Sequence, residues 1–237
     1  MPEGLETFVL PALAVMAVAY LLGSISFSII FTRAFDNVDI RDLGSGNAGL
    51  TNVLRCVGGK AALFTLIFDF AKGGVSVCIG REIFRYVCAA NGAPPYLAQY
   101  GAYLAGLACV LGHIYPLYFG FRGGKGILAT SAMVAFIDWR FFAVAVAVFA
   151  VVLAVTKIVS ISSICGAVSF PVSNFLFVYF DDYLAGHFPG GPIPLSYVWV
   201  TTVISAVTAA ILILKHRSNI VRIMNGTESR LSVKHRQ

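Results

Sequence analysis

The stretch TFVLPALAVMAVAYLLGSISFSIIFT at residues 7–32 decides the fold class, because it contains no charged side chain. A helix needs about 20 consecutive apolar residues to cross the hydrocarbon core of a bilayer, and this stretch is long enough to do so. Glu3 and Glu6 precede it, where a cleavable secretory signal would carry positive residues. We therefore expect a retained membrane span.

The composition of the whole chain agrees with this expectation. Of its 237 residues, 58% are hydrophobic and only 12% are charged, whereas a soluble domain carries about 25% charged residues. This deficit excludes a soluble enzyme, a disordered chain and a typical nucleic-acid-binding domain. We attribute the net charge of +6 to inner loops facing anionic lipid rather than to nucleic-acid binding. The five scattered cysteines have neither disulfide nor metal-site spacing.

Further apolar stretches predict an all-α integral membrane protein, a bundle of seven transmembrane helices that forms one domain over residues 1–237. The predicted spans are 6–32, 60–80, 96–119, 126–138, 140–157, 159–180 and 196–215. The fourth span is the weakest, because its apolar run is about half as long as a crossing requires.

The loop charges orient this bundle. If the N-terminus lies outside, the outer loops hold only Arg81, Arg85 and Arg140, and Lys72 lies within a span. All other cations fall in inner loops or the C-terminal tail: Arg33, Arg41, Arg55, Lys60, Arg122, Lys125, Lys157, Lys215, Arg217, Arg222, Arg230, Lys234 and Arg236. Because inner loops carry the excess of Lys and Arg, we predict an outside N-terminus and a cytoplasmic C-terminus.

The first predicted inner loop, DLGSGNAGLTNVLR at residues 42–55, is rich in glycine and in neutral hydrogen-bond donors. It contains the dinucleotide pattern GxGxxG, but that pattern has meaning only between a strand and a helix. Glycines let backbone N–H groups approach an anion, and Arg55 offers a planar cation suited to phosphate. The alternative is a flexible polar loop. The candidate phosphate ligands are Ser45, Gly46, Asn47, Thr51, Asn52 and Arg55.

The second inner loop contains FRGGKG at residues 121–126. It lacks the first glycine and the final Ser or Thr of a nucleotide P-loop. Two cations among three glycines nevertheless suit an anion, and the candidates are Gly123, Gly124 and Lys125. The alternative is that Arg122 and Lys125 only anchor the span at the membrane surface.

Two later segments add polar side chains on the same predicted side. Ser163 is one of several hydroxyl residues at the start of the sixth predicted span. In the tail, KHRSNIVR at residues 215–222 would place His216, Asn219 and Arg222 on one helix face. Taken singly, these segments could be helix caps and a solvated tail. Taken together, the four segments predict a cytoplasmic-face pocket for more than one phosphate, open to lipid.

These residues resemble the bacterial acylphosphate:glycerol-3-phosphate acyltransferases, the PlsY family. The resemblance covers nearly the whole chain and departs from the family pattern at Ser26, where the family usually has proline. The motifs that carry it are YLLGSI at 20–25, GSGNAG at 44–49, Gly112-His113, GGKG at 123–126, and His216, Asn219, Ile220, Arg222, Gly226 and Glu228.

The resemblance implies transfer of a fatty acyl group from acyl phosphate to the 1-hydroxyl of sn-glycerol 3-phosphate, giving lysophosphatidic acid and phosphate. It implies no metal, no other cofactor and no acyl-CoA. The two phosphate compounds would be the substrates, and membrane lipid would surround the protein. The functional partner would be an enzyme that forms acyl phosphate. The site would face the cytoplasm from the bacterial inner membrane.

The resemblance also implies roles for particular residues. Lys125 would be the central cation, with Ser163, His216 and Asn219 completing the catalytic set, and Arg222 and the residues of the first loop would bind substrate. A substrate phosphate would take the hydroxyl proton, which makes His216 a binder. The residues alone leave open whether His216 is instead the general base.

Two other classes of function compete with this one. Asp69 and Lys72 lie within the second predicted span, and charges inside a membrane often mark a transport pathway. This favours a phosphate or organic-anion transporter as the alternative, although we prefer an ion pair inside the bundle. A noncatalytic lipid-binding scaffold is the third possibility.

Overall fold

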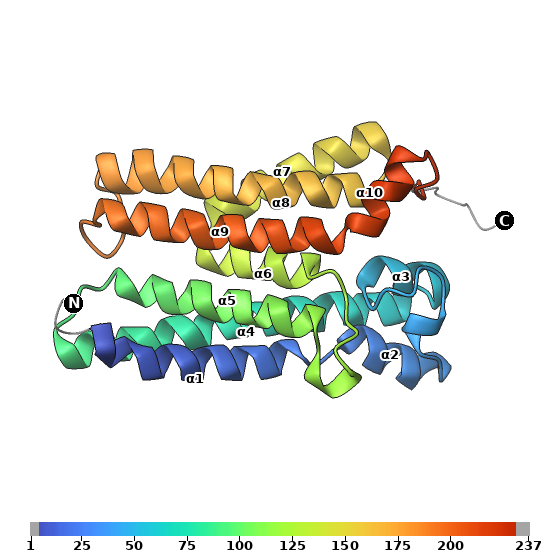
Figure 1. Ribbon diagram of the computed structural model, residues 1–237, viewed down its shortest axis with the longest axis horizontal. Helices are drawn as coiled ribbons and strands as arrows, with labels where there is room; N and C mark the ends of the chain where they lie inside the picture. Colours follow the sequence, from blue (N-terminus) through green and yellow to red (C-terminus); the bar gives the residue numbers. More distant parts are fainter. Residues whose placement is uncertain (1–4, 231–237) are drawn as a thin grey trace. The chain divides into compact units, whose positions relative to one another are not determined.

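The computed structural model describes residues 5–230, and within that range every regular element is helical (Figure 1). Glu3, used above as evidence against a cleavable signal, and Lys234 and Arg236, used to orient the chain, lie outside the described residues. The chain divides into two compact units. Unit 1 comprises the described residues up to Ile137 together with Pro189–Gly191, and unit 2 comprises Asp138–Phe188 and the described residues from Pro192 onward.

Unit 1 is built around the long helix α4. Helices α1, α4 and α5 run side by side (Figure 1), α2 and α3 pack on α4, and α6 packs on both α4 and α5. Its elements are α1 (Leu5–Gly23), α2 (Phe27–Asp36), the 3-10 turn η1 (Ile40–Asp42), α3 (Leu50–Cys56), α4 (Gly59–Asn91), α5 (Leu97–Ile114), the 3-10 turn η2 (Leu117–Phe119) and α6 (Ile127–Ile137).

Unit 2 is built around α8, which packs on both α7 and α9. The short α10 follows α9 directly. The elements are α7 (Trp139–Thr156), α8 (Val159–Leu176), the π-helix η3 (Phe177–Leu184), α9 (Leu195–Lys215) and α10 (Arg217–Met224).

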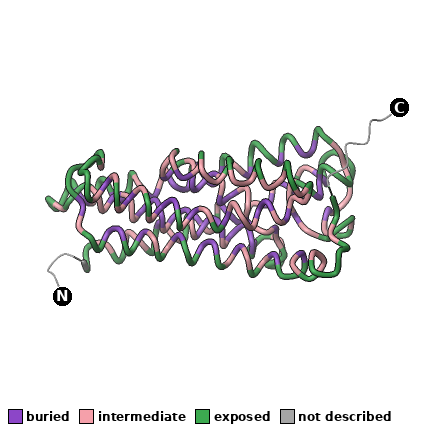
Figure 2. The backbone as a smooth tube through the Cα atoms, turned by 90° about the horizontal axis from the view of Figure 1, so that it is seen from above, coloured by how far each residue is buried: buried purple, intermediate pink, exposed green. Residues whose placement is uncertain are grey.

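Six helical segments among the described residues are long and apolar enough to cross a membrane. They are Glu6–Asp36, Gly59–Asn91, Leu97–Phe119, Trp139–Thr156, Val159–Leu184 and Leu195–Lys215. Along the helices, exposed residues alternate with buried ones (Figure 2). Many of the exposed side chains are large and apolar, as expected of helices whose outer faces contact lipid.

The fourth predicted span, at 126–138, is not confirmed as a crossing. Residues 126–138 contain α6, which has 11 residues and so measures about 16 Å at 1.5 Å per residue, against a hydrocarbon core of about 30 Å. Helix α6 is therefore too short to cross alone, and the orientation of the termini stays a prediction.

The predicted outer loop at 81–95 is wrong over most of its length, because α4 continues to Asn91. Its first charged residue is held against neighbouring helices: Arg81 bonds the side chain of Gln99 at 3.0 Å and the last carbonyls of α6. Arg85 pairs with Glu82 on the same helix at 3.1 Å. The helix ends where Gly92 adopts the left-handed conformation (φ 62°), which glycine tolerates best.

Two other predicted spans also change at their ends. The span predicted at 159–180 continues as the π-helix η3 to Leu184. The span predicted at 6–32 is interrupted between α1 and α2 and extends to Asp36. Backbone groups freed inside a membrane must find partners within the protein. Here the ammonium group of Lys72 donates to the carbonyl of Ile25 at 2.7 Å.

Close approach between the helices of unit 1 depends on glycine. A Cβ atom added to Gly80 would lie 2.2 Å from the carbonyl oxygen of Gly101, and one added to Gly101 would meet the carbonyl of Gly80 at the same distance. A Cβ on Gly73 would lie 2.8 Å from that of Ala132. Small residues at such contacts let helix backbones approach closely within the membrane. These glycine contacts hold α5 and α6 against α4.

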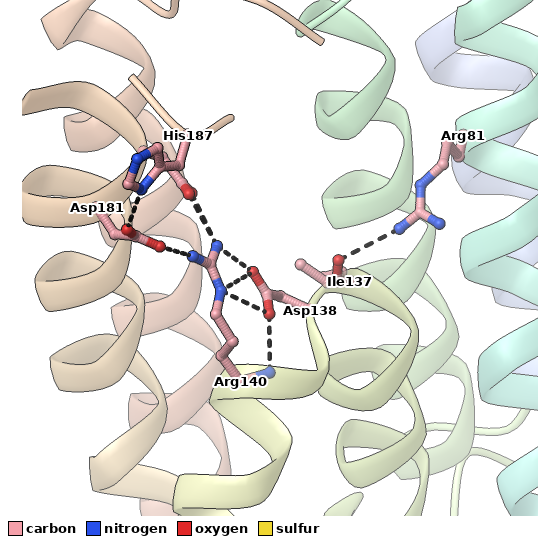
Figure 3. A network of polar contacts seen from close by, with 7 residues as sticks. Arg81, Ile137, Asp138, Arg140, Asp181 and His187 are labelled. Atoms are coloured by element: carbon pink, nitrogen blue, oxygen red, sulfur yellow. Dashed lines mark hydrogen bonds and ion pairs between the residues drawn. The ribbon is translucent and has the colours of Figure 1, made fainter. Parts of the chain in front are cut away.

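In unit 2, an ion-pair network joins the start of α7 to η3 (Figure 3). Asp138 caps α7 by accepting from the backbone N–H of Arg140 at 2.8 Å. The guanidinium of Arg140 bonds Asp138, Asp181 and Asp182, and His187 contacts Asp181 at 2.7 Å. In unit 1, Figure 3 shows Arg81 reaching the carbonyl of Ile137 at the end of α6.

Candidate functional site

The first glycine motif is a loop wrapped around the side chain of Asn52, which is 3% exposed. The amide nitrogen of Asn52 lies within hydrogen-bond distance of three carbonyls: Ile40 at 3.2 Å, Leu43 at 3.0 Å and Asn47 at 3.1 Å. Its amide oxygen accepts from the backbone N–H of Ser45 at 3.1 Å. The polar groups of Asn52 therefore hold the loop in shape.

The other candidates of this motif are more accessible. Ser45, Gly46, Thr51 and Arg55 are exposed, while Asn47 is half-buried. Gly46 has a φ of +67°, a left-handed conformation that side chains rarely adopt. Thr51 and Arg55 lie four residues apart on α3, so they share one face of that helix. The loop thus presents hydroxyl and guanidinium donors to its surroundings.

The second glycine motif folds back on the end of α5. The backbone N–H groups of Gly123 and Gly124 donate to the carbonyls of Ile114 and His113, both at 3.2 Å. A Cβ added to Gly123 would lie 2.1 Å from the carbonyl oxygen of His113, so only glycine fits there. Lys125 follows directly, half-buried and two residues before α6.

The two glycine motifs meet within unit 1. A Cβ added to Gly124 would lie 2.5 Å from the carbonyl oxygen of Ala48, so the second motif approaches the first at backbone distance. A second tie comes from Arg41, which donates to the carbonyl of Phe119 at 2.8 Å. Nine of the predicted site residues therefore belong to one assembly: Ser45, Gly46, Asn47, Thr51, Asn52, Arg55, Gly123, Gly124 and Lys125.

Arg41 is itself held by Asp39, a pair that the sequence analysis did not single out as functional. The Arg41 guanidinium bonds both carboxylate oxygens, at 2.9 and 2.8 Å, and Arg33 contacts Asp39 at 2.7 Å. The side-chain hydrogen bond from Arg41 holds the pKa of Asp39 well below its usual range, although partial burial opposes the shift. In the sequence, the only sign of this pair is the alternation of acidic and basic residues. That pattern does not reveal that Arg41 reaches the second loop.

Unit 2 holds the remaining candidates, Ser163, His216, Asn219 and Arg222. Ser163 is buried near the start of α8. His216 is 2% exposed and lies between α9 and α10, with Nδ1 positioned 2.8 Å from the carbonyl of Leu212. Because a carbonyl only accepts, a neutral His216 ring carries its proton on Nδ1 in this arrangement.

The carboxylate of Glu228 joins the polar residues of unit 2. It accepts from the amide of Asn219 at 2.6 Å, from Nε of Arg222 at 2.6 Å and from the hydroxyl of Ser160 at 2.8 Å. Burial alone would raise the pKa of Glu228, but these three hydrogen bonds outweigh it and lower the pKa. The common face predicted for His216, Asn219 and Arg222 is confirmed only in part: Asn219 and Arg222 reach one carboxylate, whereas His216 precedes α10 and contacts Leu212 instead. Glu228, quoted above only as part of a motif, was missed as their partner.

The ion pair preferred for Asp69 and Lys72 is confirmed. The ammonium nitrogen of Lys72 lies 2.7 Å from Asp69 Oδ1, and both side chains are buried. Over residues 5–230, no three His, Cys, Asp or Glu side chains are grouped so that they could hold a metal ion.

Comparison with known proteins gives one consistent result. A family model described as glycerol-3-phosphate acyltransferase matches residues 13–226. A protein of that name from Thermoanaerobacter sp. (strain X514) is 37% identical over 220 residues, covering 92% of this chain and 94% of the relative. Another from Shouchella clausii is 38% identical over 226 residues, covering 94% and 97%.

Solved structures agree with the sequence relatives. A crystal structure of PlsY (YgiH), an integral membrane glycerol 3-phosphate acyltransferase in its glycerol 3-phosphate form, is similar with a TM-score of 0.72 and 32% identity. The two chains match over 93% of this one and 96% of the other. The lysophosphatidic acid form of PlsY gives a TM-score of 0.70 at 30% identity, covering 93% and 95%.

Proposed function

This chain belongs to the family of integral membrane glycerol-3-phosphate acyltransferases, and from that membership we propose that it uses acyl phosphate as the acyl donor. The 1-hydroxyl oxygen of sn-glycerol 3-phosphate attacks the acyl carbonyl carbon, and the bond from that carbon to the phosphate oxygen breaks. The hydroxyl proton passes to a phosphate oxygen. The products are lysophosphatidic acid and inorganic phosphate.

The contact between the two glycine motifs carries this proposal. Gly124 lies against Ala48, so the Gly-Gly-Lys segment and the Gly-Ser-Gly-Asn segment belong to one assembly that carries the cations Arg55 and Lys125. Acyl phosphate is already activated. The protein therefore has mainly to orient the hydroxyl and to stabilise the charge that grows on the carbonyl oxygen and the departing phosphate.

We assign roles on that basis. Ser45, Gly46, Asn47, Thr51 and Arg55 bind phosphate, with Asn52 shaping their loop. Gly123 and Gly124 place Lys125, which stabilises the leaving phosphate. Ser163, His216, Asn219 and Arg222 supply further polar contacts to substrate, and His216 acts as a binder rather than as the base. The site lies on the cytoplasmic face of a bacterial inner membrane, and an enzyme that forms acyl phosphate supplies the donor.

The test is an assay of the purified protein in detergent. We expect phosphate release that requires both acyl phosphate and glycerol 3-phosphate, that does not occur with acyl-CoA as donor, and that yields lysophosphatidic acid. A transporter needs a sealed compartment, so turnover in detergent separates the two classes of function. Phosphate movement in vesicles without acyl transfer in detergent would contradict the proposal.

The same assay tests the expectation that no metal takes part. The proposed reaction uses only side chains and backbone donors, so EDTA should leave the rate unchanged. Loss of activity with EDTA, restored by a single divalent ion, would show that the charge balance of the site has been misjudged.

A further inference from the structure

Three buried polar side chains of unit 1 form a cluster that the proposed reaction does not use. Asp69 is 1% exposed, Lys72 6% and His113 4%. The ammonium group of Lys72 lies at the centre: 2.7 Å from Asp69 Oδ1, 3.2 Å from Nδ1 of His113 and 2.7 Å from the carbonyl of Ile25. The cluster therefore joins α4 and α5 to the interruption between α1 and α2.

His113 also contacts the second glycine motif. The carbonyl of His113 accepts from the backbone N–H of Gly124, and a Cβ on Gly124 would lie 2.3 Å from Nε2 of the ring. Because Lys72 can only donate to Nδ1, a neutral ring carries its proton on Nε2, the atom that faces Gly124. One side of His113 thus contacts the buried ion pair, and the other side contacts the loop that precedes Lys125.

The energetics favour a geometric role for this cluster. Charged side chains at membrane depth are expensive, and a buried ion pair seldom adds net stability compared with apolar residues of the same size. What such a cluster supplies is one defined arrangement, because every member has a fixed partner. Here the last residue that the arrangement contacts is Gly124. A Cβ atom added to Gly124 would also lie 2.5 Å from the carbonyl oxygen of Ala48 in the first motif.

We propose that Asp69, Lys72 and His113 are positioning residues, which fix Gly124 against Ala48 and thereby set the position of Lys125. This inference rests on the proposed function, since it assumes that Lys125 stabilises the departing phosphate. The three residues act through the loop and not by contact with substrate. A displacement of Lys125 by about 1 Å is enough to lower the rate by a factor on the order of 10².

The test substitutes His113→Asn in the full chain. Asparagine keeps an acceptor for Lys72 but lacks the ring atoms opposite Gly124. We expect kcat to fall by about 10- to 100-fold, the KM for glycerol 3-phosphate to change by less than about threefold, and the melting temperature to stay close to that of the wild type. An unchanged kcat per folded molecule would overturn the proposal.

A pair of matched variants separates positioning from stability. Asp69→Asn and Asp182→Asn each neutralise a carboxylate that is at most 3% exposed and is paired with a cation. Both should lower the melting temperature, but only Asp69→Asn should lower kcat per folded molecule. Equal kcat in the two variants would overturn the proposal, and this comparison decides the matter if His113→Asn does not fold.

A double-mutant cycle identifies the path of the effect. If His113 acts through Lys125, adding His113→Asn to Lys125→Ala should cost less than about a further threefold in kcat. Losses that multiply would overturn the proposed path. If Lys125→Ala alone keeps the full rate, the role assigned to Lys125 under the proposed function fails instead, which distinguishes the two failures.

Discussion

At the scale of single residues, Lys125 carries the sharpest expectation. If its ammonium group stabilises charge that grows on the leaving phosphate, Lys125→Ala should lower the rate of phosphate release by a factor on the order of 10²–10³. Lys125→Arg should bind substrate yet react slowly, because a planar fork does not place its charge as an ammonium group does. Rates are compared at equal membrane abundance and similar melting temperature.

The control for Lys125 is Lys157, an exposed cation with a φ of 58° that ends α7. Lys157→Asn removes a charge while suiting the left-handed backbone, and it should keep the wild-type rate. If Lys125→Ala retained more than about half of the activity, Lys125 would be a membrane-surface anchor and would leave the site.

The contribution of Glu228 to the stability of unit 2 should depend on pH. Glu228→Gln replaces an anionic acceptor of three hydrogen bonds by an amide, so the melting temperature should fall. Because the pKa of Glu228 in the folded chain lies below its ordinary value of 4.5, the carboxylate contributes its full stability above that value. This contribution is lost as the pH falls through the folded pKa.

The gap in melting temperature between the wild type and Glu228→Gln should therefore be constant from neutral pH down to about 4.5 and should narrow below it. Melting curves of the purified protein over this pH range measure the gap. A gap that stays constant into strong acid would mean that the Glu228 carboxylate does not hold Asn219 and Arg222.

At the scale of elements, the loop before α6 has no room for an added side chain at Gly124. Gly124→Ala places a methyl group 2.3 Å from Nε2 of His113 and 2.5 Å from the carbonyl of Ala48, so the loop must move. We expect a fall in activity of at least tenfold, because Lys125 moves with it. The measurement is kcat for protein that still folds.

Gly59→Ala is the matched glycine control, because it lies at the start of α4 with nothing within 4 Å of an added Cβ. It should keep both activity and melting temperature, and alanine even favours the helix. Equal activity in the two alanine variants would show that the contact between Gly124 and Ala48 does not matter for catalysis.

At the scale of the whole molecule, the positive-inside pattern predicts which side each loop faces. A tag inserted at Gly92 or at Gly191 should be accessible from outside the cell, whereas a tag after Gln237 should be accessible only from within. The first insertion belongs at Gly92, since α4 continues to Asn91 and a tag at 81–91 would disrupt a helix. Labelling of intact and permeabilised cells with a membrane-impermeant reagent measures accessibility.

A C-terminal tag that is accessible from outside would overturn the predicted cytoplasmic site. The same experiment bears on α6. With six crossings the two ends lie on one side of the membrane, whereas with seven they lie on opposite sides, so a second tag at the N-terminus decides whether the α6 segment counts as a crossing.

The sequence by itself determined the class of molecule and the identity of its motifs. Long uncharged stretches such as residues 7–32 predict membrane helices from length and polarity alone, because the bilayer imposes the same requirement on every segment regardless of its neighbours. Glycines and cations in the predicted inner loops likewise indicated anion-binding segments, since that chemistry belongs to the residues themselves. These features are local, and a local pattern is visible in one chain.

Only the tertiary structure decided how these segments are held. The packing of α4 beyond residue 80, the interruption at Ile25 and the contact of Gly124 with Ala48 all involve partners distant in sequence: Gln99 for Arg81, Lys72 for Ile25 and His113 for Gly124. The loop predicted at 81–95 is wrong because α4 continues to Asn91, and the charge of Arg81 finds its partners on the packed helices α5 and α6. Such pairings follow from packing, which no periodicity or composition records.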